Sequence, residues 1–372
     1  MRKDEIKGLT EDNDDKDNFE SRAEQSRAEQ SRAEQSRAEQ SRAEQSYRNK
    51  ITYLSFVLSI LIIVRHSVNI DVYGIESGFA FGVEKLISEI TDLAVPTFFT
   101  LSGYLFFQNY SPKKLKRKWE SRVKSVLIPY LIWNFIAYLY YEFLTIIPGI
   151  SGQINMHIEP FSLKWAIKNM VFGYHNITWF LQNLMAYIII APLLYPIIKR
   201  KKLSIIILGL LYLYVVITNS SWIGYGGLYL SGAILGIHFK DKVKALGSYL
   251  IVPLIYICIS VELIHCLNVD IGGFYFVLRL TQVAAIWFLA DIFAISVEPK
   301  WWMKISFFIY CTHSMILESL EKVFLIVFGK TEFGAILDII LAPILTLVII
   351  IFVAWIFKHW GRLWKVLTGT RG

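Results

Sequence analysis

Residues 51–68 read Ile-Thr-Tyr-Leu-Ser-Phe-Val-Leu-Ser-Ile-Leu-Ile-Ile-Val-Arg-His-Ser-Val, a nearly continuous apolar run that ends in two basic residues and a short polar turn. It can cross a bilayer as a helix, because about 20 apolar residues at about 1.5 Å each span roughly 30 Å of hydrocarbon. Arg65 and His66 lie near its end, in the outer half of the membrane if the helix starts inside. Ionisable side chains inside a span are costly and usually functional. We therefore predict a membrane protein in which His66 either belongs to a functional site or, together with Arg65, marks the outer interface.

The composition of the whole chain agrees with a membrane protein. Of its 372 residues, 55% are hydrophobic and 18% are charged, and the mean hydropathy is +0.46. Soluble domains are about 45–50% apolar and about 25% charged. Cys258, Cys266 and Cys311 lie in or beside apolar segments, and their spacing fits neither a disulfide framework nor a zinc site. We predict an all-α membrane protein that holds no metal.

Ten transmembrane helices are predicted after the first 50 residues. The predicted spans are residues 51–68, 88–108, 122–146, 176–198, 203–219, 221–239, 247–266, 274–297, 305–328 and 335–357. Lys and Arg gather in alternate loops, at 113–118, 199–202, 240–244, 300–304 and 358–365. The positive-inside rule places these loops, and with them both termini, in the cytoplasm. Because the basic clusters mark topology, the net charge of +8 does not indicate nucleic-acid binding.

A polar tail precedes the spans. Residues 1–47 have few apolar side chains to bury, so we predict that they are disordered. Residues 21–45 are five identical copies of Ser-Arg-Ala-Glu-Gln, a period that fits neither an α-helix nor a heptad. Tandem copies of the pentanucleotide AGCAG encode this peptide, and gain or loss of one copy shifts the reading frame. We hypothesise a slippage-prone tract that switches expression in a bacterium; the alternative is an ordinary duplicated linker.

Two stretches carry side chains suited to substrate or cofactor binding. Residues 95–107 read Val-Pro-Thr-Phe-Phe-Thr-Leu-Ser-Gly-Tyr-Leu-Phe-Phe, in which Ser102 and Gly103 allow close approach of a helix or ligand and Tyr104 adds a hydroxyl. Arg122 and Lys124 open the third span, where they either mark topology or bind cofactor phosphates. Close helix packing is the alternative for the first stretch.

Other polar side chains lie in the outer half of the predicted bundle. Trp179 begins the fourth span, and His313 lies in Tyr-Cys-Thr-His-Ser, where a structural histidine within a helix is the alternative. Arg65 either belongs to a site or reaches headgroups at the interface. Some of the remaining ionisable residues are expected to pair with one another: His66, Asp92, Glu262, His265, Arg279, Glu318 and Asp338.

These features together resemble the integral-membrane acyltransferase 3 family. The first-span His66, the stretch 95–104, the basic stretch 122–129, Trp179-Phe-Leu and Tyr310-x-x-His313 occur in the order and spacing of that family. The resemblance covers residues 48–357, which we take as the membrane domain, with a short basic cytoplasmic tail at 358–372. One departure is Ser55, eleven residues before His66, where many members carry arginine.

The resemblance implies a bacterial inner-membrane enzyme that moves an acyl group, usually acetyl from acetyl-CoA, onto sugars of surface glycans. By that resemblance His66 acts as general base or accepts the acyl group. The remaining residues that it singles out are Arg122, Lys124, Ser102 and Tyr104 near acetyl-CoA, and Trp179, Arg65 and His313 near the acceptor. A cytoplasmic thioester and an outer His66 differ in depth, so a kinked or re-entrant path, or an acyl relay, is needed.

Three functions are compatible with these observations. The leading one is an O-acetyltransferase whose partners are acyl-CoA, the bilayer and a polysaccharide or lipid-linked glycan such as O-antigen or capsule. A transporter or flippase for a glycan or small solute is the alternative; it predicts an internal repeat, and residues 48–200 and 201–357 show none. The third is a non-catalytic partner of a glycan synthase.

Overall fold

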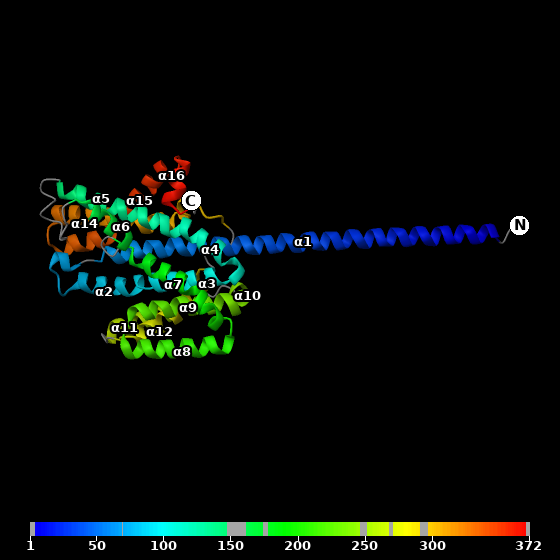
Figure 1. Ribbon diagram of the computed structural model, residues 1–372, viewed down its shortest axis with the longest axis horizontal. Coiled ribbons are helices and arrows are strands. Elements are labelled where there is room, and N and C mark those ends of the chain that lie inside the picture. The colour runs from blue at the N-terminus through cyan, green and yellow to red at the C-terminus, as the bar shows by residue number, and fades with distance from the viewer. Residues whose placement is uncertain are drawn as a thin grey trace.

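A computed structural model describes residues 4–68, 70–146, 161–173, 178–245, 251–267, 271–290 and 297–369. These residues are helical and contain no strand, which confirms the predicted all-α class. The helices form one bundle, from which α1 (Asp4–His66) projects as a long rod (Figure 1).

Helices occupy all ten predicted spans. After the end of α1 the bundle is built from α2 (Phe79–Thr91), α3 (Ala94–Phe107), α5 (Ile128–Ile146), α7 (Trp179–Ile198), α8 (Lys201–Thr218), α9 (Ser221–His238), α11 (Ile251–Leu267), α12 (Phe274–Leu289), α14 (Ser306–Phe328) and α15 (Glu332–Phe357). Of the described helical segments, 6 are long and apolar enough to cross a membrane by length and composition. The predicted span ends 247–250 and 291–296 lie outside the described residues.

Shorter helices connect these elements. They are η1 (Ile70–Tyr73), η2 (Pro112–Lys114), α4 (Leu115–Arg122), the π-helix η3 (Val123–Leu127), α6 (Leu163–Phe172), α10 (Lys240–Ala245), η5 (Trp301–Met303) and α16 (Gly361–Leu367). The π-turn η3 lies between α4 and Pro129, which has no N–H to continue a regular helix. The third predicted span therefore contains a short wide turn directly after Arg122.

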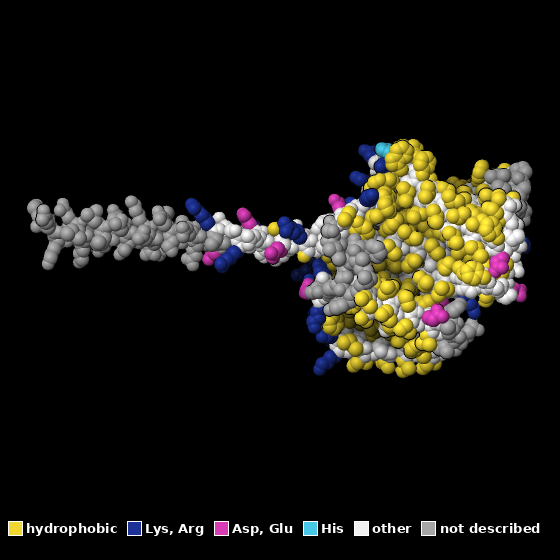
Figure 2. Space-filling model, turned by 180° about the vertical axis from the view of Figure 1, so that it is seen from behind, with side chains coloured by type: hydrophobic (Ala, Val, Ile, Leu, Met, Phe, Trp, Pro, Cys, Tyr) yellow, Lys and Arg dark blue, Asp and Glu magenta, His cyan; other side chains and the backbone are white. Residues whose placement is uncertain are grey.

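The two ends of the bundle differ in charge. Lys and Arg side chains gather at the end from which the α1 rod emerges, where α4 and α10 also lie, and apolar side chains cover the broad lateral face (Figures 1 and 2). We call this end the tail side and the opposite end the far side. The apolar lateral face and the apolar helices identify a multi-pass membrane protein.

The N-terminal tail is the largest difference between expectation and structure. Residues 4–50 continue α1 as helix in place of the disorder that we predicted. The repeat is rich in Ala, Arg, Glu and Gln, which are strong helix formers, and Glu44 pairs with Arg48 one turn on at 3.1 Å. Our prediction weighed only what the tail could bury, whereas local helix propensity does not depend on burial.

The second predicted span is two helices rather than one. Instead of a single helix over 88–108, α2 ends at Thr91 and α3 begins at Ala94. Pro96 lies in the first turn of α3, a position where its missing N–H costs little. Thr97 and Thr100 donate their hydroxyls to the carbonyls of Leu93 (2.6 Å) and Pro96 (3.0 Å). The break places Asp92 at the far side.

Glycines allow α3 and α9 to touch backbone to backbone. A Cβ added at Gly232 would lie 1.8 Å from the Thr100 carbonyl oxygen, and one added at Gly103 would lie 2.0 Å from that of Tyr229. Small residues at a helix crossing permit such approach in a membrane, where packing replaces the hydrophobic effect. The predicted packing role of Gly103 is thereby confirmed, and its partner is α9.

The C-terminal segment packs on the bundle. The Trp133 indole Nε1 in α5 donates to the Leu367 carbonyl at 2.9 Å, and the ring of Trp364 lies 5.3 Å from that of Phe308. We predicted only a short basic tail here. Its apolar residues Trp364 and Leu367 are buried. This segment therefore packs one apolar face on the bundle in addition to carrying basic charges.

Candidate active site

A polar cavity of about 610 Å³ lies at the far side of the bundle. Helices α1, α3, α7 and α14 contribute to its wall, and we call it the far-side cavity. Three residues singled out in the sequence (Arg65, His66 and Trp179) line it, together with Thr91, Asp92, Tyr225, Tyr275, Ser314, Glu318 and Glu321 among others. The mixture of aromatic rings with acidic, basic and hydroxyl groups suits a polar ligand such as a sugar.

Two histidines meet beside this cavity. The ring of His66, at the end of α1, lies 5.1 Å from the ring of His313 in α14. His313 is 1% exposed, and its Nδ1 donates to the Tyr310 carbonyl at 2.7 Å. That bond leaves Nε2 as the basic nitrogen, and among the described residues this atom has no hydrogen-bond partner. The structure therefore brings together two residues that are 247 positions apart in sequence.

A second cavity, of about 410 Å³, lies nearer the tail side in the same four helices. We call it the tail-side cavity. Ser102, Arg122 and Lys304 line it, and so does Ser55. Arg122 ends α4, and its guanidinium carbon lies 5.9 Å from the centre of the Phe106 ring. This cavity combines a cationic mouth with apolar walls.

Two of the predicted cofactor-binding residues lie elsewhere. Lys124 is exposed and lines a surface groove with Trp119, because η3 turns it away from Arg122. The buried Tyr104 hydroxyl points toward α10, with the Lys240 carbonyl at 3.4 Å. Neither side chain lines the tail-side cavity, so the structure does not bring these two residues together with Ser102 and Arg122.

The two cavities meet at a pair of aromatic side chains. Phe180, in the first turn of α7, and Tyr310, in α14, line both cavities. Their ring centres are 5.8 Å apart in an edge-to-face arrangement, and the ring of Tyr310 lies 6.0 Å from that of His313. The two cavities, the histidine pair and these two rings therefore lie next to one another.

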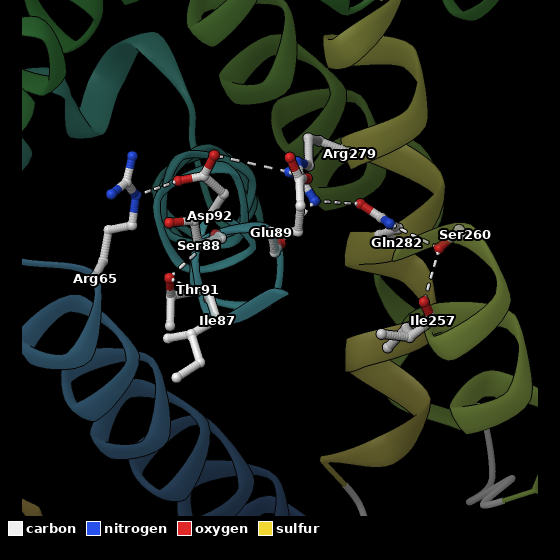
Figure 3. A network of polar contacts seen from close by, with 10 residues as sticks. All are labelled: Arg65, Ile87, Ser88, Glu89, Thr91, Asp92, Ile257, Ser260, Arg279 and Gln282. Carbon is white, nitrogen blue, oxygen red and sulfur yellow. Dashed lines mark hydrogen bonds and ion pairs between the residues drawn. The ribbon is translucent and has the colours of Figure 1, made fainter. Parts of the chain in front are cut away.

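An ion-pair network lies beside the far-side cavity, and two of its members, Arg65 and Asp92, line that cavity (Figure 3). Arg65 donates to Asp92 at 2.7 Å, and Arg279 in α12 lies 2.9 Å from Glu89 and 3.8 Å from Asp92. Gln282 accepts from Arg279 at 2.9 Å and donates to Ser260 of α11 at 2.7 Å. Asp92 and Arg279 both belong to the set of ionisable residues of which we expected some to pair, and the network joins the ends of α1 and α2 to α11 and α12.

Carboxyl groups on α14 and α15 occupy another part of the far side. Glu318 accepts from Tyr141 at 2.7 Å and from Ser314 at 3.0 Å, and Asp338 accepts from Tyr73 at 2.9 Å. These bonds give a partner to carboxylates that are costly to bury alone, although the Oδ1 atom of Asp338 has none among the described residues. Of the other ionisable residues expected to pair, His265 has a side chain that lies outside the described part of the chain.

Sequence reasoning missed two features of the site. Lys304 lines the tail-side cavity, whereas we treated it as a topology marker, since a loop lysine carries no other signal. Phe180 was quoted only as part of a motif, because a phenylalanine in a span is usually packing. Their functions depend on which helices face each other, which no local pattern encodes.

Comparisons with known proteins agree with this geometry. The Acyl_transf_3 family model, described as an acyltransferase domain, matches residues 48–359. Comparison with curated proteins and with solved structures finds no match. The matched segment covers most of the chain, and it holds both cavities and both histidines. The chain belongs to the acyltransferase 3 family of membrane acyltransferases.

Proposed function

We propose that this protein is an O-acetyltransferase that transfers acetyl from acetyl-CoA to a sugar hydroxyl of a bacterial surface polysaccharide such as O-antigen or capsule. The observation that carries the proposal is the pair of cavities, which approach each other from opposite ends of the bundle beside His66 and His313. A reaction between a cytoplasmic donor and an external acceptor requires such an arrangement.

The tail-side cavity suits the donor. Its Arg122 and Lys304 supply positive charge for the phosphates of acetyl-CoA, and Ser102 supplies a hydroxyl deeper inside. The exposed lysines of residues 113–118 lie on the same side and add to the attraction. The positive-inside rule supports a cytoplasmic tail side in a bacterial inner membrane, with both termini inside. No metal enters this scheme.

The far-side cavity suits the acceptor. Trp179 offers an aromatic face for a sugar ring, and its own ring lies 5.1 Å from that of Tyr225. Arg65 and Asp92 present donors and acceptors for hydroxyl groups. The acceptor is a polysaccharide or a lipid-linked glycan, because a sugar that arrives from outside reaches His66 first.

The reaction follows from these positions. The acceptor oxygen attacks the thioester carbonyl, a C–O ester bond forms, and the C–S bond breaks. His66 takes the hydroxyl proton as general base and returns it to the leaving CoA thiolate, so that free CoA-SH departs. The alternative is transfer of the acyl group first to His66 and then to the sugar, with the same products. His313 in its neutral form holds a second basic nitrogen beside His66.

A transporter or flippase for a glycan or small solute is the second candidate, since two cavities at opposite ends also suit alternating access. The third is a non-catalytic partner of a glycan synthase. Proton NMR of purified surface polysaccharide separates the three. We expect O-acetyl signals from an expressing strain and none from a deletion strain or a His66→Ala strain.

Two results would decide against the enzyme. Identical acetylation in all three strains would refute acyl transfer. Polysaccharide that disappears from the surface in the deletion strain, with no acyl group in any strain, would favour transport or assembly. Membrane levels of the His66→Ala protein, measured by immunoblot, exclude simple loss of the chain.

We also infer that expression is phase-variable, from the five identical repeats in residues 21–45. Slippage within the AGCAG tract would change the reading frame ahead of the membrane domain and so switch the surface modification. Sequencing the tract in many single colonies tests this. Variable repeat number with identical codons supports the switch, and synonymous codons scrambled between copies would overturn it.

A further inference from the structure

Four helices, α1, α3, α7 and α14, line both cavities. Along each of them, residues nearer the tail side line the tail-side cavity, and residues nearer the far side line the far-side cavity. In α1, Ser55 lines the tail-side cavity and His66 the far-side cavity. In α3, Ser102 lines the former and Val95 the latter. The same order holds in α7 and α14, and in both helices the change occurs at a residue that lines both cavities, Phe180 or Tyr310. Among the described residues these two side chains alone are shared.

The shared side chains belong to a layer of packed aromatic rings. Phe180 is 9% exposed and packs against Phe99, with ring centres 4.6 Å apart, and against Phe98 at 6.0 Å. Tyr310 joins the layer from the α14 side, 5.8 Å from Phe180. Edge-to-face contacts of this kind favour a defined ring arrangement. Phe180 and Tyr310 therefore lie between the two cavities and are held there by neighbouring rings.

The layer also lies directly beside the histidine pair. Tyr310 is 6.0 Å from His313 by ring centres, and His313 is 5.1 Å from His66. The two side chains that line both cavities are therefore also close to the histidine pair.

We propose that Phe180 and Tyr310 form a partition that admits a short acyl group from the tail-side cavity to His66 and excludes longer acyl groups and bulk water. The inference rests on the proposed acyl transfer and adds its specificity. Because the wall is made of side chains from two facing helices, a smaller residue at position 180 widens the passage without changing either cavity's polar groups.

An accessibility experiment tests the partition without acyl transfer. The full-length chain carries Val95→Cys, which faces the far-side cavity, and has Cys258, Cys266 and Cys311 replaced by alanine. A small, membrane-impermeant cationic thiol reagent is applied to right-side-out and inside-out vesicles. We expect modification of residue 95 from the far side only.

Widening the partition should change this result. With Phe180→Ala added, we expect modification from the tail side as well. Phe180→Leu, which keeps an apolar side chain and so preserves folding, should give the same change at a lower rate. The matched control is Leu184→Ala, one turn along α7, which enlarges the tail-side cavity alone and should leave residue 95 closed to the tail side.

A second readout tests acyl selection. Labelled acetyl-CoA and butyryl-CoA are supplied to inside-out vesicles, and label in the polysaccharide is measured. We expect Phe180→Ala to raise the butyryl-to-acetyl ratio by about tenfold or more, since one methylene is worth roughly 10–200-fold in a tight apolar site.

The two arms separate the two failures. If residue 95 stays closed to the tail side in Phe180→Ala and Phe180→Leu, and the acyl ratio is unchanged, the partition is refuted while acyl transfer stands. If no acyl label reaches the polysaccharide in any variant, including the unsubstituted chain, the proposed function is refuted, and with it the selection of acyl groups.

Discussion

The backbone contact between α3 and α9 predicts that one added methyl group, in Gly232→Ala, destabilises the protein. Gly232→Ala places a Cβ 1.8 Å from the Thr100 carbonyl oxygen and 2.8 Å from the Tyr104 backbone nitrogen. Ordinary contact begins near 3.4 Å, so the two backbones must separate by about 1.5 Å. Both obstructing atoms belong to the main chain, and no side chain can rotate away.

The expected cost is at the upper end of overpacking, about 3 kcal/mol. Separation of the helices also loosens the close contact at Gly103, whose added Cβ would meet the Tyr229 carbonyl at 2.0 Å. Ser102 belongs to α3, one of the two separated helices, and lines the tail-side cavity. We therefore expect Gly232→Ala to lower both the activity and the stability of the protein.

Gly209→Ala in α8 is the matched control. No heavy atom lies within 4 Å of a Cβ built there, and alanine is a better helix former than glycine by about 0.5–1 kcal/mol. The same substitution is therefore expected to destabilise at one position and to be neutral or stabilising at the other.

Thermal unfolding of both purified variants in detergent, followed by size-exclusion chromatography after heating, measures the difference. Gly232→Ala should lose its monodisperse peak at a clearly lower temperature than the unsubstituted protein. Equal midpoints for Gly232→Ala and Gly209→Ala would refute the backbone contact between α3 and α9.

Two further predictions concern polar contacts. Arg279→Met should destabilise the protein by about 3–5 kcal/mol, because it leaves Glu89 without its partner at 2.9 Å. Thermal unfolding measures this loss, and a double variant with Glu89→Gln should recover part of it. An Arg279→Met variant as stable as the unsubstituted protein would contradict the prediction. Trp133→Phe should remove the 2.9 Å bond to Leu367 at a cost of about 1 kcal/mol and increase hydrogen exchange in α16. Trp222→Phe, at a side chain that is 50% exposed, should change neither the stability nor the hydrogen exchange of α16. If the Trp133→Phe and Trp222→Phe variants show equal exchange in α16, the docking of α16 through Trp133 is refuted.

The helical membrane fold could be predicted from local sequence because its cause is local. A run such as residues 51–68 must be helical in hydrocarbon, since every backbone N–H and C=O has to be bonded within the segment. The limits of this reasoning appear at Asp92, where a proline four residues on starts a new helix, and in the tail, where helix propensity outweighs the absence of anything to bury.

Composition, hydrophobic run length and motif spacing are enough to predict the helical class, the apolar segments and the family, and they single out His66 as a candidate. They do not predict that His313 is the neighbour of His66, that Lys304 rather than Lys124 lines the tail-side cavity, or that Phe180 and Tyr310 lie between the two cavities. These features depend on tertiary structure, because a cavity belongs to several helices at once. Its lining depends on how each helix is rotated about its axis, and backbone contacts such as that at Gly232 set this rotation between segments far apart in the chain.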